Sequence, residues 1–381
     1  MKTKDLTRLY LVMSLIWNPI FLGPVILVAL VKLAHMSVEQ IFISEALATG
    51  LILALDAPSG IVADMIGRKK CVILGRTLLL ISSILIAYMS TPFHGILANL
   101  LWAVSISLCS GAESALVYDE FIKRNALQEY QDLMKKVSSY GFLIAALATL
   151  ASGFLAEISL RLPLILSVPG IAIGVCMLIF FPQEEKITHT HTWKSYIEHT
   201  KEAAKDVWSH THLRTLILWF ALLSLVGKIY FFTYNPYLEH VSVPYGTVGM
   251  IFFGINMVSF IASRYAFTIY RKSGKVSFWF GFCSQGLIML IQAIVVKTWC
   301  GWLFTLQGLT RGYIDTVEQA VLNKEIQKEK RATILSFQSS FENLLRAITL
   351  LAVAPISNNP ILLMGLLGTT SLLLGFLSRK K

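Results

Sequence analysis

The sequence contains few charged residues for its length. Only 14% of its 381 residues are Asp, Glu, Lys or Arg, whereas 55% are hydrophobic. Soluble domains typically carry about 25% charged residues. So few charges cannot cover a water-facing surface of this size, which excludes an ordinary soluble domain.

Cysteine is also scarce, and its spacing is not that of a metal site. The five are Cys71, Cys109, Cys176, Cys283 and Cys300. All lie within or at the ends of apolar stretches, where we interpret them as small buried residues. Histidine clusters only at 189–191 and 210–212, and neither cysteine nor a carboxylate completes a ligand set there. Because no nucleophile triad or cofactor-binding loop is evident either, we expect no metal, no cofactor and no enzymatic activity.

The apolar residues are grouped in stretches of about 20, the length of a helix that spans a hydrocarbon core of about 30 Å. Lipid offers backbone groups no water to bond, so such stretches must be helical. Twelve can be counted: 9–31, 38–62, 71–90, 95–118, 137–158, 162–181, 214–236, 246–269, 276–296, 300–322, 333–354 and 360–378. The sequence therefore predicts an all-α membrane protein with about twelve transmembrane helices.

Lys and Arg are distributed unequally between the two ends of these stretches. With a cytoplasmic N-terminus, 25 of the 33 fall on the cytoplasmic side, within residues 2–8, 68–70, 123–136, 186–214, 271–275, 324–331 and 379–381. The opposite side receives Lys32, Arg161 and Lys297. The positive-inside rule then places both termini in the cytoplasm. We expect the membrane to be a bacterial inner membrane. Charge spread over so many short segments also explains the net charge of +11 without a nucleic-acid partner.

One long hydrophilic stretch divides the chain near its middle. Residues 1–181 hold six apolar stretches, residues 182–213 form a linker, and residues 214–381 hold the other six. Within the linker, apolar residues from Trp193 to Trp208 recur at helical intervals between charges, which predicts an amphipathic helix on the cytoplasmic membrane surface. Weak similarity between the halves favours two pseudo-symmetric six-helix bundles.

The most specific motif lies between the second and third stretches and reads Gly60-Ile-Val-Ala-Asp64-Met-Ile-Gly67-Arg68-Lys69-Lys70. It resembles the signature loop of the major facilitator superfamily, Gly-x-x-x-Asp-x-x-Gly-Arg followed by a basic residue. Tyr118-Asp119, at the end of the fourth stretch, is similar to the family too. The resemblance covers the whole chain and implies a transporter with two bundles around a central cavity and alternating access.

Physical arguments also explain the residue types at two fixed positions of this loop. Gly60 would let two helices approach closely. Asp64 is an anion that suits the positive N-terminal end of another helix. The resemblance implies that this helix is the eleventh, that the contact latches the two halves together, and that Arg68 pairs with Asp119. The alternative is that residues 68–70 are ordinary positive-inside anchors.

One motif of drug–proton antiporters in this superfamily is missing. Those proteins often carry a Gly-Pro in the fifth helix, whereas the fifth stretch here, Gly141 to Gly153, contains no proline. The departure weakens an assignment as a drug antiporter but does not affect the expected fold.

Ionisable residues at membrane depth are costly and usually face a cavity or a partner. Arg311, Asp315 and Glu318 are spaced to share one face of the tenth stretch. Lys228 and Asn235 likewise share a face of the seventh. The resemblance implies that the first, fourth, seventh and tenth helices line the central cavity. The expected substrate-cavity residues are Asn18, Lys228, Phe231, Asn235, Arg311 and Asp315.

Buried carboxylates are the candidates for proton coupling. Glu113 is the first choice, because it has no cation within four residues and water would reach it only when the cavity opens inward. Glu318 and Glu45 are the next candidates. Glu113 could instead be a satisfied helix contact. We interpret Glu342 and Arg346 as an ion pair within the eleventh stretch.

Two further arginines, Arg76 and Arg264, lie near cytoplasmic ends, and we expect their side chains to reach the membrane surface. Arg311 and Asp315 could neutralise each other, which would leave Glu318 free.

These observations favour a proton-coupled secondary transporter that exports a small amphipathic organic compound. Its expected partners are that solute, protons and the lipid bilayer, and it is expected to be a monomer. Two cations in the expected cavity also suit uptake of an organic anion or zwitterionic metabolite. The alternative of another class is a membrane sensor or other non-transport protein, but the longest polar segment is too short for a soluble output domain.

Overall fold

The computed structural model describes residues 2–18, 20–182, 205, 207–273, 276–326 and 331–379, and every regular element in these ranges is a helix. The helix predicted on the membrane surface and the histidines at 189–191 lie mainly or wholly outside the described residues. The chain divides into two compact units. We call residues 1–36 and 47–196 the N-terminal unit, and residues 37–46 and 197–381 the C-terminal unit.

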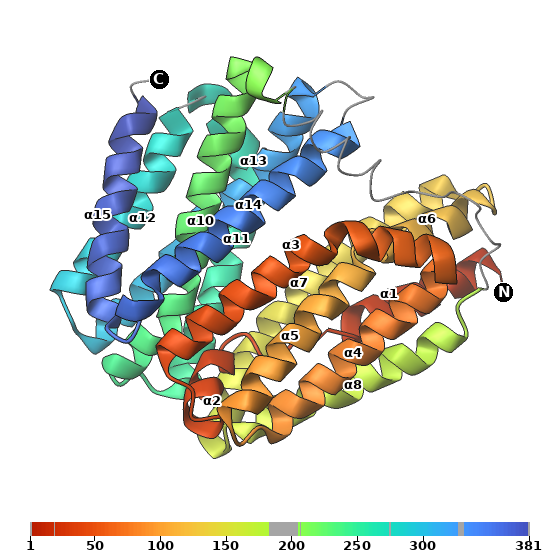
Figure 1. Cartoon of the computed structure of the whole chain (residues 1–381), viewed down its shortest axis with the longest axis horizontal. Helices are drawn as coiled ribbons and strands as arrows, with labels where there is room; N and C mark the ends of the chain where they lie inside the picture. The colour runs from red at the N-terminus through yellow and green to blue at the C-terminus, as the bar shows by residue number, and fades with distance from the viewer. Residues whose placement is uncertain are drawn as a thin grey trace. The chain divides into compact units, whose positions relative to one another are not determined.

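The N-terminal unit is built from helices that Figure 1 colours from red to yellow-green. Their bounds are α1 Thr3–Ile16, α2 Ile26–Leu33, α3 Val38–Ile66, α4 Arg68–Tyr88, α5 Pro92–Cys109, α6 Ala112–Ile122, α7 Leu127–Ile158 and α8 Arg161–Ile179. The first residues of α3 are grouped with the C-terminal unit. Helix α4 packs against both α5 and α8.

The C-terminal unit continues through the green and blue helices of Figure 1. Their bounds are α10 Thr211–His240, α11 Tyr245–Ser273, α12 Val276–Ile294, η1 Thr298–Leu306, α13 Gln307–Glu325, α14 Arg331–Val353, η3 Ala354–Ile356 and α15 Pro360–Arg379. Helix α12 lies along α15, and α11 lies along α13.

Three of the predicted stretches are interrupted. The first separates into α1 and α2, where Gly23-Pro24 precedes Ile26, since proline does not continue a preceding helix. The fourth separates into α5 and α6 at Gly111, whose φ of 65° lies in the left-handed region that glycine tolerates. The tenth begins with the 3₁₀ helix η1 before it becomes α13. The three interruptions place helix ends next to Asn18, Glu113 and Gln307.

Glycine pairs form close helix contacts in both units. In α8, a Cβ at Gly170 would lie 2.6 Å from the Ile16 carbonyl, and one at Gly174 would lie 2.5 Å from the Trp17 Cβ atom. In α13, Gly308 and Gly312 similarly meet the backbone of α11. Small residues four apart let helix backbones approach each other in this way. These pairs fix α1 against α8 and α13 against α11.

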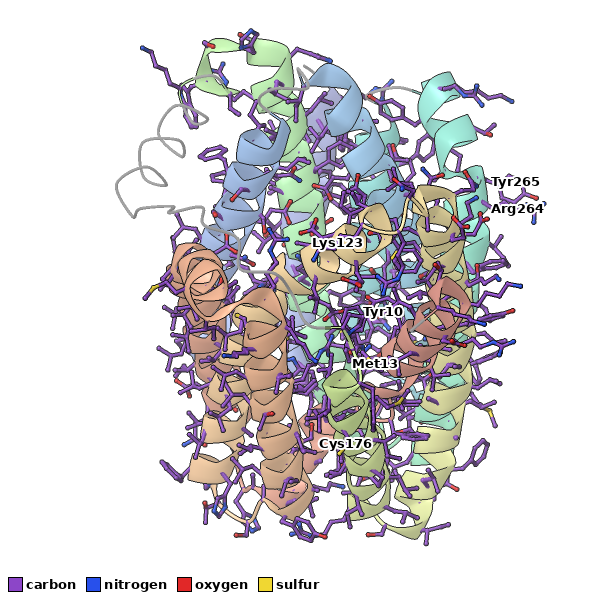
Figure 2. All side chains as sticks on the ribbon, turned by 90° about the vertical axis from the view of Figure 1, so that its right-hand side faces the viewer. Tyr10, Met13, Lys123, Cys176, Arg264 and Tyr265 are labelled. Carbon is purple, nitrogen blue, oxygen red and sulfur yellow. The ribbon has the colours of Figure 1, made fainter. Side chains whose placement is uncertain are left out.

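The outer helix faces remain apolar. On α15, Leu373 is 65% exposed and Phe376 is 58% exposed. Figure 2 shows Tyr265 of α11 pointing outward beside Arg264, whereas Tyr10 and Met13 of α1 are buried. Exposed apolar residues of this kind suit contact with lipid rather than with water. Arg264 is exposed, and the expectation that its side chain reaches the membrane surface stays a prediction.

Eight helical segments among the described residues are long and apolar enough to cross a membrane. They include α4, α8, α10, α15 and the combined segment Pro92–Ile122, and α12 contributes a shorter apolar helix, Phe278–Ile294. These spans make the chain an all-α, multi-pass membrane protein. The expected number of twelve stays a prediction, as does the boundary of the linker at 182–213.

Candidate functional site

The signature loop is a one-residue turn between two helices. Gly67 has a φ of 92°, and it separates the end of α3 from the start of α4. Any other residue would be strained there, which explains why the motif requires glycine. Arg68 is the first residue of α4 and forms an ion pair with Asp119 of α6.

The neighbouring lysine ties the same turn to α8. The Lys69 ammonium donates to the carbonyl oxygen of Ile179 at 3.0 Å and to that of Phe181 at 2.5 Å. Ile179 is the last residue of α8 and Phe181 lies just beyond it, at a helix end where backbone acceptors lack a partner within the helix. The loop is therefore held by charge at α6 and by hydrogen bonds at α8.

The contacts predicted for Gly60 and Asp64 of the motif are not observed among the described residues. The close helix contact expected at Gly60 is not formed within the N-terminal unit, because a Cβ there would meet no described heavy atom within 4 Å. Asp64 lies on the last turns of α3, but its side chain is outside the described residues. Its contact with another helix stays a prediction, as does the gating role of the loop.

A buried charge cluster lies farther along α4. The Arg76 side chain is 11% exposed and that of Glu113 is 20% exposed, and Arg76 Nη2 lies 2.5 Å from Glu113 Oε2. The other nitrogen, Nη1, donates to Asn18 Oδ1 at 3.2 Å. The guanidinium lies over the Trp17 ring, 3.9 Å from its centroid. Tyr10 donates from its hydroxyl group to Glu113 Oε1 at 3.3 Å.

The cluster changes two expectations. The expectation that Arg76 reaches the membrane surface is wrong, because the side chain is buried between α1, α4 and α6. Glu113 does have a cationic partner, supplied by α4 rather than by its own helix. The interruption at Gly111 places Glu113 in the first turn of α6, where the helix dipole also favours a negative charge.

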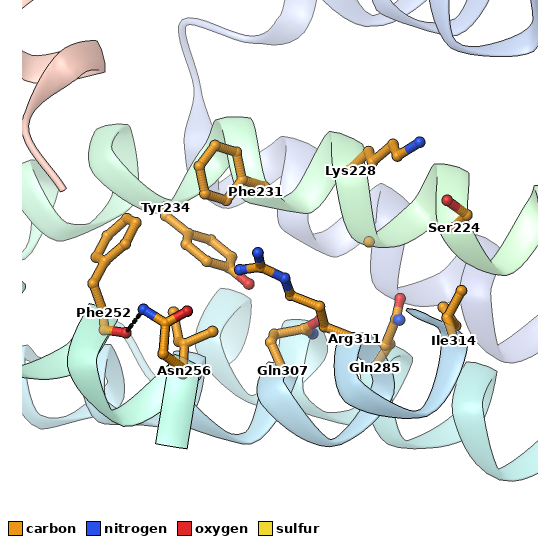
Figure 3. Close-up of a pocket in the computed structure, with 12 residues that line it drawn as sticks. Ser224, Lys228, Phe231, Tyr234, Phe252, Asn256, Gln285, Gln307, Arg311 and Ile314 are labelled. Atoms are coloured by element: carbon orange, nitrogen blue, oxygen red, sulfur yellow. Dashed lines mark hydrogen bonds between the residues drawn. The ribbon is translucent and has the colours of Figure 1, made fainter. Parts of the chain in front are cut away.

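The C-terminal unit contains a cavity of about 390 Å³ between α10, α11, α12 and α13. Figure 3 shows the Tyr234 ring pointing from α10 toward Arg311, which lies between that ring and Gln285, whereas the Lys228 side chain points away from Arg311. The lining residues are Ser224, Gly227, Lys228, Phe231, Tyr234, Phe252, Ile255, Asn256, Gln285, Gln307, Arg311 and Ile314. A volume of this size accommodates an organic molecule in the usual range of ligand pockets, about 300–1,000 Å³.

A polar chain lies beside this cavity. The Gln338 amide donates to Glu318 and, at 3.0 Å, to Glu342 Oε1. The second Glu342 oxygen lies 3.7 Å from the Lys228 ammonium. The ion pair expected between Glu342 and Arg346 is therefore replaced by one between α14 and α10. The charge of Lys228 is partly offset at the edge of the cavity.

The structure separates the predicted cavity residues into groups. Lys228, Phe231 and Arg311 line the cavity of the C-terminal unit. Asn235 is 2% exposed and is not one of the lining residues. Asn18 belongs to the Arg76 cluster in the N-terminal unit. Glu45, a candidate for proton coupling, is half-buried in α3, and the Asp315 side chain is outside the described residues.

The sequence does not predict several residues of the Arg76 cluster and of the cavity in the C-terminal unit. Gln285 and Gln307 line the cavity, but amides within apolar stretches carry no spacing signal that marks them. Arg76 was noticed only for its position near a helix end. The pairs Gly170/Gly174 and Gly308/Gly312 do carry a recognisable signal, the spacing of small residues four apart, which could have predicted the helix contacts.

The fold is that of known transporters. The nucleoside transporter NupG matches with a TM-score of 0.72 at 14% identity, over 99% of this chain and 98% of that one. A bacterial homologue of the human lysosomal transporter Spinster, in an inward-facing and unoccupied conformation, matches with a TM-score of 0.70 at 13% identity, over 100% and 98%. A D-xylose–proton symporter matches with a TM-score of 0.66 at 10% identity, over 98% and 97%.

No curated protein sequence matches the chain. The family model described as Major Facilitator Superfamily matches residues 136–350, which is more than half of its 381 residues. The chain therefore belongs to the major facilitator superfamily and is a membrane transporter rather than an enzyme.

Proposed function

We propose that the chain is a secondary transporter that couples proton movement to the export of a small amphipathic organic compound. The observation that carries the proposal is the buried pair of Arg76 and Glu113. A proton on Glu113 would cancel its charge and release the buried guanidinium from its counter-ion. Buried charges interact strongly with their surroundings, so gaining or losing that proton changes the energy of the packing around it.

The hydrogen bonds of Glu113 connect protonation to helix position. One carboxylate oxygen accepts from Tyr10 of α1, and the other lies against Arg76 of α4. A proton added to Oε2 must displace the guanidinium, because the protonated oxygen becomes a donor. Protonation of Glu113 therefore weakens the attraction between α4 and α6. Loss of the proton restores the ion pair with Arg76 and draws the two helices together. A carboxylate of this kind can drive alternating access if water reaches it in one state and not in the other.

The cavity of the C-terminal unit supports an amphipathic solute. Its wall contains the aromatic rings of Phe231, Tyr234 and Phe252 together with the charged groups of Lys228 and Arg311. An organic molecule with an apolar body and a polar group fits both features. We propose that this cavity of the C-terminal unit forms the solute site.

Export rests on the resemblance of the Gly60–Lys70 loop and of Tyr118-Asp119 to bacterial relatives that are mostly assigned to efflux. The second candidate is proton-coupled uptake of an organic anion or zwitterionic metabolite. Lys228 and Arg311 favour that candidate, because two cationic side chains line one cavity. We propose in either case a monomer in a bacterial inner membrane with both termini in the cytoplasm, following the distribution of Lys and Arg.

The test is the Glu113→Gln variant, which imitates the protonated carboxyl group. In proteoliposomes with an imposed pH gradient, we expect it to lose gradient-driven solute accumulation yet keep solute binding and exchange without a gradient. Glu129→Gln is the matched control, because Glu129 is exposed in the first turn of α7. It should behave as the unmodified chain does. If Glu113→Gln still concentrates solute, the proton site lies elsewhere, and Glu318 and Glu45 become the next candidates.

A further inference from the structure

Helix α12 carries two buried glutamines, about two turns apart, whose hydrogen bonding differs. Gln285 is 1% exposed and Gln292 is 0% exposed. The Gln292 amide is paired at both ends, because Oε1 accepts from the Tyr230 hydroxyl group and Nε2 donates to the Cys300 carbonyl group at 3.0 Å. In contrast, Gln285 Oε1 has no hydrogen-bond partner among the described residues. The same residue type on the same helix is therefore satisfied at one position and not at the other.

The unpaired amide of Gln285 faces the cavity of the C-terminal unit. Gln285 is one of the lining residues, and Figure 3 shows its amide pointing toward α10, the helix that carries Ser224 and Lys228. Buried polar atoms are nearly always paired, because leaving one unpaired costs free energy. A molecule in the cavity can supply the missing hydrogen bond if it carries an N–H or O–H donor.

Helix α10 leaves space beside this amide, because it places Gly227 opposite Gln285. A Cβ at Gly227 would lie 3.6 Å from Gln285 Nε2, the one described atom outside α10 within 4 Å of it. Both residues line the cavity, together with the apolar side chains of Ile255 and Ile314. A ligand can therefore bring a polar group to Gln285 while its apolar body contacts the isoleucines.

A second amide of the cavity also offers its oxygen. Asn256 Nδ2 donates to the Phe252 carbonyl group at 3.0 Å, as the dashed line in Figure 3 marks. This bond within α11 holds the amide nitrogen against the backbone, which leaves Oδ1 to accept a hydrogen bond from a ligand. Asn256 lines the same cavity as Gln285. Two amide oxygens thus favour a ligand with hydrogen-bond donors.

We infer that Gln285 determines the specificity of this cavity for amphipathic compounds whose polar group donates a hydrogen bond, such as a primary carboxamide or a hydroxyl group. The inference rests on the proposed transport function, because it names the chemical class of the solute at the same site. Ethers, esters and tertiary amides offer acceptors only, so they leave Gln285 Oε1 unpaired. A site built around a buried polar group rejects an analogue that lacks the matching donor.

Two probes isolate the donor. 2-Naphthamide and N,N-dimethyl-2-naphthamide share the apolar ring and the carbonyl group, but only the first has N–H groups. Neither is charged, so the cationic side chains of the cavity do not decide between them. Binding is measured by calorimetry on the full chain in nanodiscs, with the heat of empty nanodiscs subtracted. We expect 2-naphthamide to bind at least about tenfold more tightly, as one hydrogen bond to a buried group commonly contributes. Equal binding of the two probes, or no detectable binding of 2-naphthamide, would overturn the inference.

The variant Gln285→Met assigns the preference to its residue, because methionine keeps the length of the side chain and removes the amide. We expect it to weaken 2-naphthamide by about tenfold and to leave the affinity of the dimethyl probe unchanged. Gln128→Met, at an exposed position of α7, is the control and should keep the full preference. A preference that persists in Gln285→Met comes from the bulk of the methyl groups, and Gln285 then does not determine specificity.

The paired glutamine of α12 provides a control for folding. Gln285→Met removes no hydrogen bond between described residues, so we expect a melting temperature no lower than that of the unmodified chain. Gln292→Met should lower it, because Tyr230 and the Cys300 carbonyl group lose their bonds to the amide. If both variants melt at the same lowered temperature, Gln285 is a structural residue like Gln292 and the inference fails.

The binding experiment is independent of proton coupling. If the two probes are discriminated as expected but no pH gradient drives the movement of 2-naphthamide, the proposed coupling fails and the role of Gln285 stands. If a gradient drives transport of other solutes while the two probes bind alike, the role of Gln285 fails and the coupling stands.

Discussion

Arg76 and Glu113 hold opposite charges in a space where neither is well hydrated. Removing one partner of a buried ion pair leaves the other uncompensated and commonly costs about 3–5 kcal/mol, whereas replacing both is often neutral or stabilising. We expect Arg76→Met to lower the thermal stability of the purified protein strongly. The double variant Arg76→Met, Glu113→Gln should recover most of that loss. Unfolding followed by circular dichroism in detergent measures both.

The exposed pair of Asp132 and Lys135, separated by 3.1 Å on α7, provides the control. Lys135→Met should leave stability almost unchanged, because exposed ion pairs contribute little. If Arg76→Met is as stable as Lys135→Met, the buried pair contributes little to folding. A double variant as unstable as Arg76→Met would mean that Arg76 acts mainly through Trp17 and Asn18, its other contacts.

For single residues, the sequence indicates which ionisable side chains are costly to bury in the membrane. It does not indicate which of them form ion pairs with each other. Glu113 stands out as a carboxylate within an apolar stretch, yet its partner is 37 positions away on another helix. The same limit applies to Lys228, whose contact with Glu342 joins α10 to α14. A local spacing rule finds pairs within one helix, so it favoured Glu342 with Arg346. Tertiary packing decides the pairs between helices.

The helices of both units are brought together by glycines. In α13, a Cβ at Gly312 would overlap the Ser259 carbonyl group of α11. The obstacle is backbone, so it cannot move aside as a flexible side chain would. We expect Gly312→Ala to lower stability by about 1–3 kcal/mol, the usual cost of overpacking. The variant should also disturb the cavity, because Arg311 precedes Gly312 on the same helix turn.

The matched control is Gly50→Ala in α3, where an added Cβ meets no described atom within 4 Å. Alanine favours a helix over glycine by about 1 kcal/mol, so this variant should be neutral or slightly more stable. Thermal unfolding of the two variants side by side measures the difference. Equal stability would show that α11 and α13 can separate at no cost, contrary to the close contact at Gly312.

Element type follows from the sequence more readily than element boundaries. Long apolar stretches must be helical in lipid, and the described residues contain helices wherever such stretches were predicted. The interruption at Gly111 was not predicted, because an isolated glycine inside an apolar stretch is compatible with a continuous helix. Its positive φ in the structure reveals the break.

Each unit has a hydrophobic core of its own. Phe220 and Phe282 belong to the core of the C-terminal unit, and Phe121 and Leu133 belong to that of the N-terminal unit. The latch predicted for the signature loop comes from the family resemblance and not from either core, so it stays a prediction that experiments on the loop can test.

The ion pair of Arg68 and Asp119 allows gating to be separated from folding. Its side chains are 21% and 35% exposed, so solvent weakens their attraction, and its loss should cost stability only about 1 kcal/mol or less. If the loop latches the two halves during transport, Arg68→Gln and Asp119→Asn should each reduce transport severely in proteoliposomes while folded protein remains in the membrane.

The charge exchange Arg68→Asp, Asp119→Arg provides the matching test, because it restores the attraction with its direction reversed. We expect it to recover part of the transport lost in the single variants, since Asp is well tolerated at the N-terminal end of α4. Arg124→Gln, which breaks the neighbouring pair with Glu120, is the control and should leave transport near normal. Near-normal transport by the double variant Asp64→Asn, Asp119→Asn would count against the whole gate, because both acidic positions of the predicted latch would then be dispensable.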